Sequence, residues 1–191
     1  MTLLAKLMLA TVATMSAGTV QAKTPAPKPD TPVDCDSCKA WNGEVTPFNV
    51  FGNTWYVGTA GLSAVLVTSP QGHVLLDGAL PQSAPLIIAN IAALGFRIED
   101  VKFILNSHAH WDHAGGIAAL QRASGATVVA SASGALGLQS GTNGKDDPQF
   151  QAKPVVHVAK VEKVKVVGEG DAIKLGPLNL TAHMTPGHTP G

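Results

Sequence analysis

Charged side chains are scarce in this sequence, and their charges cancel. Asp, Glu, Lys and Arg make up 14% of the 191 residues, and 13 basic residues balance 13 acidic ones. The usual charged share is about a quarter. Nucleic-acid binding needs a basic surface, and a solvating tail needs an excess of acidic residues. The sequence therefore predicts neither a nucleic-acid partner nor an acidic tail.

Three further features are missing: an internal repeat, an apolar segment long enough to cross a bilayer, and a serine-nucleophile motif. The apolar stretch at residues 7–17 is shorter than the ~20 residues that a membrane-spanning helix needs. Neither Gly-x-Ser-x-Gly nor Ser-x-x-Lys occurs in the chain. We therefore expect no hydrolysis through a serine acyl-enzyme.

The N-terminus has the pattern of a cleavable signal peptide at residues 1–22. Lys6 supplies positive charge, the apolar stretch follows it, and residues 20–22, Val-Gln-Ala, form a small-x-small cleavage pattern. Removing these 22 residues leaves 169, enough for one domain, with a net charge near −1. We expect a periplasmic protein with no membrane partner after cleavage. An uncleaved membrane anchor is the alternative.

Residues 23–45 are predicted to form an extended, proline-rich tether that carries both cysteines. Four prolines lie among residues 23–34. Cys35 and Cys38 form a Cys-x-x-Cys pair, and no second pair completes a zinc ribbon. After export we expect a disulfide, either across this small loop or to a cysteine in a longer chain. We expect no catalytic role for the pair.

The most informative stretch is residues 107–116, with the sequence Ser-His-Ala-His-Trp-Asp-His-Ala-Gly-Gly. Four of its side chains can bind a metal: His108, His110, Asp112 and His113. The apolar run at residues 101–105 predicts a buried strand before this motif, and a helix is predicted to start near Asp112. Ligand sites of α/β sheets lie where a strand leads into a helix. A His-rich surface loop, with Asp112 only capping the helix, is the alternative.

The spacing within the motif predicts two metal ions. His108 and His110 are two residues apart, so an extended backbone directs both side chains the same way. The side chains of the adjacent Asp112 and His113 point in different directions and can bind a second ion. His188 follows a strand-like segment on a turn rich in Gly and Pro, and it is predicted as the third ligand of the first ion. A catalytic zinc usually has three protein ligands and one open position.

These motifs resemble the metallo-β-lactamase superfamily and, in their details, its subclass B3. The resemblance rests on His-x-His-x-Asp-His at 108–113 and on Gly-His-Thr-Pro-Gly at 187–191. Thr-Trp-Tyr-Val-Gly at 54–58, Leu-Leu-Asp-Gly at 75–78 and Pro-Gln at 81–82 are also similar to that subclass. The similarity covers residues 46–191, which we expect to form the domain.

The resemblance implies an α/β fold, the αββα sandwich of this superfamily, with the metal site at one edge. It implies two zinc ions, the first on His108, His110 and His188 and the second on Asp112 and His113. It also suggests that Asp77 orients the metal loop through hydrogen bonds; a simple turn residue is the alternative. We expect a monomer whose partner is a small-molecule β-lactam.

The implied reaction is hydrolysis of the β-lactam amide bond by metal-bound hydroxide, which would give antibiotic resistance. Asp112 would bind the second zinc and orient the nucleophile. Two alternatives stay open. The same motif occurs in hydrolases of lactones and thioesters, and the chain could be a zinc-binding module without activity.

The second zinc of the family takes one more histidine, downstream of the Pro-Gly-His turn. This sequence ends at Gly191, three residues after His188. We therefore expect an N-terminal fragment in which much of the C-terminal half of the sandwich is missing. Such a fragment should fold poorly by itself and turn over little or no substrate, because one sheet face and one zinc would lack partners.

The rest of the chain is predicted to be scaffold. A hairpin is expected around Gly52-Asn53, strands at 62–67, 73–76, 127–130 and 161–167, and a helix at 84–94 that ends at Gly95. Residues 141–154 are expected to form a polar loop. Three histidines outside the motifs are expected to pack or to face solvent: His73, His157 and His183.

Overall fold

The computed structural model describes residues 29–151 and 155–191 of the chain. The predicted signal peptide and the first part of the predicted tether lie outside the described residues. The hairpin, the strands and the helix that the sequence predicts are present within the described residues, with ends shifted by a few positions.

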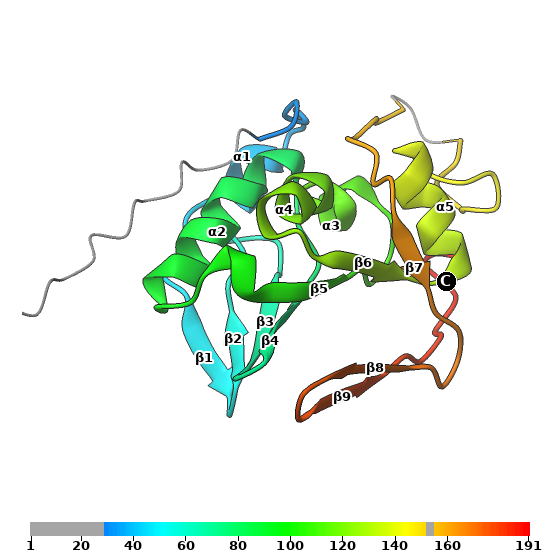
Figure 1. The fold of residues 1–191 in the computed structure, drawn as a ribbon. Coiled ribbons are helices and arrows are strands. Elements are labelled where there is room, and N and C mark those ends of the chain that lie inside the picture. Colours follow the sequence, from blue (N-terminus) through cyan, green and yellow to red (C-terminus); the bar gives the residue numbers. More distant parts are fainter. Residues whose placement is uncertain (1–28, 152–154) are drawn as a thin grey trace, which may run out of the picture.

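A seven-stranded sheet forms the centre of the fold (Figure 1). Its strands lie side by side in chain order: β1 (Phe48–Phe51), β2 (Thr54–Tyr56), β3 (Val65–Ser69), β4 (Gly72–Leu76), β5 (Val101–Leu105), β6 (Thr127–Ala130) and β7 (Val164–Val166). Strands β1 to β4 are antiparallel, and β4 to β7 are parallel. The central strands β4 and β5 are largely apolar because both faces of the sheet are covered there.

Helices cover one face of this sheet (Figure 1). They are α1 (Cys38–Trp41), α2 (Ala84–Ala93), α3 (Trp111–Ala114), α4 (Ile117–Ser124) and α5 (Ala132–Ser140), with 3-10 turns at Pro81–Ser83 and Ile98–Asp100. Ile87 and Ile91 of α2 and Leu120 of α4 are fully buried in one core with Ile104 of the sheet. Burying each such side chain contributes about 1.5–3 kcal/mol. Among the helices of residues 29–151 and 155–191, none combines the length and apolar character that crossing a bilayer requires.

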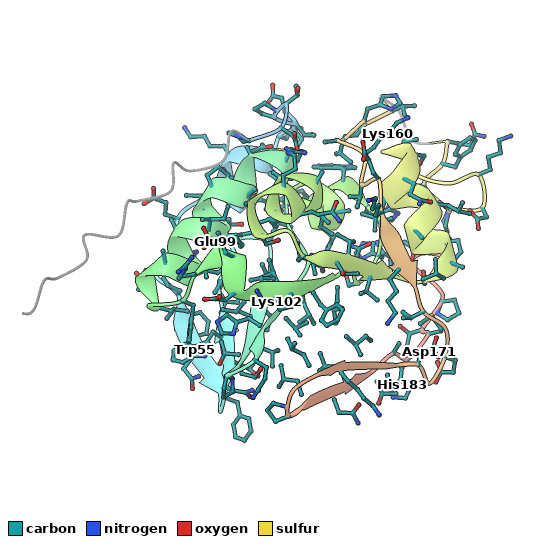
Figure 2. All side chains as sticks on the ribbon, viewed as in Figure 1. Trp55, Glu99, Lys102, Lys160, Asp171 and His183 are labelled. Atoms are coloured by element: carbon teal, nitrogen blue, oxygen red, sulfur yellow. A yellow bond between two sulfur atoms is a disulfide. The ribbon has the colours of Figure 1, made fainter. Side chains whose placement is uncertain are left out.

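A β-hairpin lies on the opposite face of the sheet. Its strands are β8 (Ala172–Leu175) and β9 (Leu178–Thr181). Side chains from the sheet and from the hairpin project into the space between them (Figure 2), which holds a groove of about 430 Å³. Leu105 and Val129 of the sheet lie in a second apolar cluster with Ile173 and Leu180 of the hairpin. The described residues thus supply three of the four predicted layers, and the mixed α/β class is confirmed.

Part of the predicted tether, residues 33–41, packs against the domain. Cys35 and Cys38 form a disulfide across the small loop, and Cys38 is buried in the core. Val33 donates its backbone N–H to Gln82 Oε1 (3.1 Å) and accepts from Gln82 Nε2 (2.8 Å). Trp41 packs on the same core. The apolar side chains after the proline-rich stretch favour burial, and this holds residues 33–41 on the fold.

Candidate metal centre

The loop that carries the predicted ligands, residues 107–116, is held against the segment that follows β4. Gly78 donates its N–H to the carbonyl of His113 (2.8 Å), and Gly116 donates to the carbonyl of Ala79 (3.2 Å). A Cβ atom on Gly116 would collide with the carbonyl oxygen of Gly78. Glycine is therefore needed for the two backbones to approach this closely. The single helix predicted here is instead split by this approach into α3 and α4.

Asp77 lies at the carboxyl end of β4 with a left-handed backbone, at a φ of 60°. That conformation costs a non-glycine residue about 1–2 kcal/mol. Four donors surround its carboxylate: the N–H of Ser107 (2.7 Å), Ser107 Oγ (2.6 Å), His113 Nδ1 (3.1 Å) and Asn106 Nδ2 (3.2 Å). The strained backbone is thus fixed by contacts to the metal loop, as is common at functional sites.

The Asp77 carboxylate is linked to two of the predicted ligand rings. His113 donates from Nδ1 to Asp77, which leaves its Nε2 with a free lone pair. Ser107 Oγ donates to Asp77 and lies 3.1 Å from His108 Nδ1, from which it can accept a hydrogen bond. This leaves Nε2 of His108 free as well. Such hydrogen bonds fix the tautomer and orientation of metal-binding histidines. Nothing in the local sequence predicts this bridging role of Ser107.

Three imidazole rings meet in front of this network: His108, His110 and His188. One nitrogen of each lies within 4.8 Å of the others, and His110 Nδ1 is 3.1 Å from His188 Nε2. His108 Nε2 is buried and has no hydrogen-bond partner among the described residues. Two nitrogens bound to one tetrahedral zinc at 2.0–2.1 Å are about 3.3 Å apart. The three rings therefore fit a common metal ion.

A second group of possible ligands adjoins the first. It comprises His108, Asp112 and His113, whose ligand atoms also lie within 4.8 Å of one another. His113 Nε2 is 3.7 Å from Asp112 Oδ2, and the ring centroids of His108 and His113 are 4.1 Å apart. All five predicted ligands thus lie at one edge of the fold, and His108 is shared between the two groups. This arrangement can hold two neighbouring metal ions.

His110 has a further partner that the sequence did not reveal. Its Nε2 lies 2.9 Å from Oδ2 and 3.1 Å from Oδ1 of Asp147. Both side chains are buried, with 3% and 8% of their surface exposed. Asp147 belongs to the polar loop predicted at residues 141–154, and nothing in its local sequence distinguishes it from the neighbouring Asp146.

The pKa values of two of these histidines are shifted in opposite directions. Burial, reinforced by the neighbouring rings of His113 and His110, lowers the pKa of His108 to about 4. The hydrogen bond to Asp77 raises the pKa of His113 above its ordinary value, against the effect of burial. His108 is therefore neutral near pH 7, which is the form that binds a metal.

Trp111, within the metal motif, packs against a tryptophan from the N-terminal segment. The ring centroids of Trp41 and Trp111 are 6.2 Å apart, at an interplanar angle of 37°. Trp111 also lines a small hollow together with Gln149 and Phe150 of the polar loop. Trp111 thus both packs the metal loop against the N-terminal segment and lines the hollow next to that loop.

The remaining histidines pack in the core or face solvent, as predicted. His73 is buried on β4 and contacts the Phe96 ring edge-on, with centroids 5.0 Å apart. His183 follows β9 on the hairpin side of the molecule (Figure 2), where it is exposed and paired with Glu169 at 3.0 Å. His157 is exposed. Neither metal-capable group of the described residues includes any of the three.

The sequence model of the metallo-beta-lactamase superfamily matches residues 58–191 of this chain. Among solved structures, the Rm3 metallo-beta-lactamase is 61% identical with a TM-score of 0.79, covering 83% of this chain and 58% of that chain. MEM-A1, a subclass B3 metallo-beta-lactamase isolated from a soil metagenome library, is 56% identical with a TM-score of 0.76, covering 79% of this chain and 56% of that chain. The resemblance predicted from the motifs is confirmed.

A more distant relative is the hydroxyacylglutathione hydrolase of Anaeromyxobacter dehalogenans. It is 35% identical over 126 residues, which are 66% of this chain and 38% of that protein. The chain thus spans less than two thirds of the length of each of these three proteins.

Proposed function

Since the chain belongs to the metallo-beta-lactamase superfamily, we propose that the protein hydrolyses the amide bond of β-lactams with the help of zinc. The observation that carries this proposal is the pair of adjoining ligand groups at one edge of the sheet, which share His108. The identity of 61% to a metallo-beta-lactamase, against 35% to a glutathione thioester hydrolase, supports a β-lactam as the substrate.

In this proposal His108, His110 and His188 hold the first zinc, and Asp112 and His113 hold the second. The donors are imidazole nitrogens and one carboxylate, a set typical of zinc. When bound, zinc brings the pKa of a coordinated water to near 7 and so supplies a nucleophile at neutral pH. Asp112 is the one carboxylate in the two ligand groups. In this proposal Asp112 would also accept a hydrogen bond from the attacking water and orient it toward the lactam carbonyl.

Asp77 and Ser107 act on the rings and not on the substrate. Asp77 accepts from Nδ1 of His113, and Ser107 bridges Asp77 to His108. Each contact leaves Nε2 of the ring free to bind metal. Preset ring orientations reduce the reorganisation that metal binding would otherwise require.

The proposal also covers the location of the protein in the cell and its oligomeric state. A predicted signal peptide, the disulfide between Cys35 and Cys38, and a β-lactam substrate agree with a periplasmic enzyme that confers antibiotic resistance. We propose a monomer that takes a small molecule as its substrate.

Hydrolysis of a glutathione thioester is the second candidate, favoured by the match to the hydroxyacylglutathione hydrolase. Turnover of a carbapenem and of S-lactoylglutathione, measured side by side on the protein from its complete natural gene, separates the two. The proposal predicts that the carbapenem is hydrolysed far faster. Preferential turnover of the thioester would replace the β-lactam assignment while leaving the metal ligands as they are.

A further inference from the structure

The polar loop at residues 141–151 brings a buried carboxylate to the rear of a metal-ligand ring. Asp147 faces Nε2 of His110 at 2.9 and 3.1 Å, and 37 residues separate the two in the chain. Only 3% of the His110 side chain and 8% of the Asp147 side chain are exposed, so little water can compete for this contact. A hydrogen bond between such groups is stronger than one at the surface, because the carboxylate is charged and shielded.

The direction of this hydrogen bond decides which nitrogen of His110 can bind metal. A carboxylate only accepts, so Nε2 of His110 carries the proton and donates to Asp147. The lone pair then lies on Nδ1, which is 3.1 Å from Nε2 of His188. With the opposite tautomer, Nδ1 would carry a proton and could not bind a metal ion. Asp147 therefore favours the ligand form of the ring.

The loop fixes Asp147 by its own hydrogen bonds. Asp147 donates its N–H to the carbonyl of Gly144 (3.1 Å), and its Oδ1 accepts from the N–H of Gln149 (2.7 Å). Its own carbonyl accepts from the N–H of Phe150 (3.0 Å). These contacts are typical of an aspartate in a tight turn, which holds its carboxylate in place. Oδ1 is thus held by the loop, and Oδ2 makes the shorter contact to His110, at 2.9 Å.

We propose that Asp147 is a positioning residue for the first metal site, acting through His110. Asp77 is hydrogen-bonded to His113 directly and to His108 through Ser107. His110 has no such contact with Asp77, and Asp147 supplies its carboxylate partner instead. The inference rests on the metal site of the proposed function and not on its substrate. It also means that the conformation of the loop at 141–151 affects how tightly the first metal is held.

The test is zinc affinity in the protein from the complete natural gene, with Asp147→Ala, Asp147→Asn and the control Asp146→Asn. Asp146 is the exposed neighbour on the same loop. Competition with a chromophoric chelator gives the affinity of each zinc, and the visible spectrum of the cobalt-substituted protein reports the coordination geometry. We expect Asp147→Ala to weaken one zinc by about 10–100-fold and to change the cobalt spectrum. The control should match the wild type.

Asp147→Asn should weaken zinc less than Asp147→Ala, because the amide oxygen can still accept from His110 but is uncharged. If Asp147→Ala does not fold, as judged by circular dichroism, Asp147→Asn decides alone, with a weakening of about threefold or more expected. Wild-type zinc affinity and cobalt spectrum in the folded Asp147 variants would overturn the inference, even if the loop became sensitive to proteases. A wild-type protein that binds no zinc would instead sink the proposed function, and this inference with it.

Discussion

Nδ1 of His110 and Nε2 of His188 lie 3.1 Å apart, although 78 residues separate them in the chain. One ring comes from the loop after β5 and the other from the turn beyond β9. Two lone pairs that face each other at this distance repel unless a proton or a cation lies between them. The convergence of distant parts of the chain on this point is the structural basis for the proposed first zinc site.

Replacing His188 by alanine should strongly weaken binding at the first zinc site. The variant keeps two of the three rings, and we expect zinc affinity there to fall by about 100-fold or more. His183→Ala is a matched control, because His183 is also exposed, lies five residues earlier and contacts Glu169 instead of the metal groups. Isothermal titration of both metal-free proteins with zinc makes the comparison. Equal zinc affinity in the two variants would remove His188 from the ligand set.

Asp77→Asn should weaken zinc binding while leaving the fold intact. Asparagine tolerates the left-handed backbone at this position. Its amide group, however, cannot accept from Ser107 and His113 as the carboxylate does, so we expect an affinity about 10–100-fold lower. Zinc titration together with a thermal melt measures both effects. Asp36→Asn, an exposed position in the N-terminal segment, serves as the control and should behave as the wild type. Unchanged affinity in Asp77→Asn would mean that Asp77 is only a turn residue.

Gly116→Ala should destabilise the fold at the metal loop. The added methyl group would meet the carbonyl oxygen of Gly78, a backbone atom that cannot move aside cheaply. We expect the free energy of unfolding to fall by about 1–3 kcal/mol in urea denaturation. At Gly168 a Cβ would meet only an Asp171 oxygen at 3.8 Å, so Gly168→Ala should change the free energy of unfolding by less than about 0.5 kcal/mol. Similar losses in both variants would show that the close approach at Gly116 is not limiting.

Acid should destabilise the metal-free protein partly through His73. Burial lowers the pKa of His73 below the ordinary value of 6.5, which an unfolded chain would show. The unfolded state therefore binds more protons as the pH falls below about 6.5, and the stabilising contribution present above that pH is lost. His108 acts in the same direction, because its pKa is lowered to about 4.

His73→Gln should consequently lose less free energy of unfolding than the wild type between pH 7 and pH 5. Urea titrations in the presence of a chelator measure this difference. His157→Gln removes an exposed histidine and should keep the wild-type loss. If His73→Gln loses as much free energy of unfolding as the wild type between pH 7 and pH 5, His73 does not contribute to the acid sensitivity.

Short-range patterns were sufficient to predict most of the strands, the helix at 84–94 and the closeness of the four candidate ligands at 108–113. Apolar runs and turn residues lie next to one another in the sequence, and the motif at 108–113 concentrates its ligands in one loop. Asp147 could not be found this way. Its partner is 37 residues away, and the contact depends on how the loop folds back on α3.

Where the scaffold differs from the sequence-based prediction, the cause is again a contact between distant parts of the chain. The prolines of the N-terminal segment indicate an extended chain, but the burial of Cys38 and Trp41 is decided by the core that receives them. The helix predicted near Asp112 is interrupted because Gly116 approaches Gly78, which lies in the segment after β4. In each case the deciding contact is tertiary and leaves no local signal.

The central claim is tested most directly by carbapenem hydrolysis with the protein from the complete natural gene, before chelator treatment, after it, and after zinc is restored. The account predicts turnover that disappears with the chelator and returns with zinc. A folded, zinc-loaded protein that does not hydrolyse the carbapenem, or turnover that persists after complete removal of metal, would contradict it.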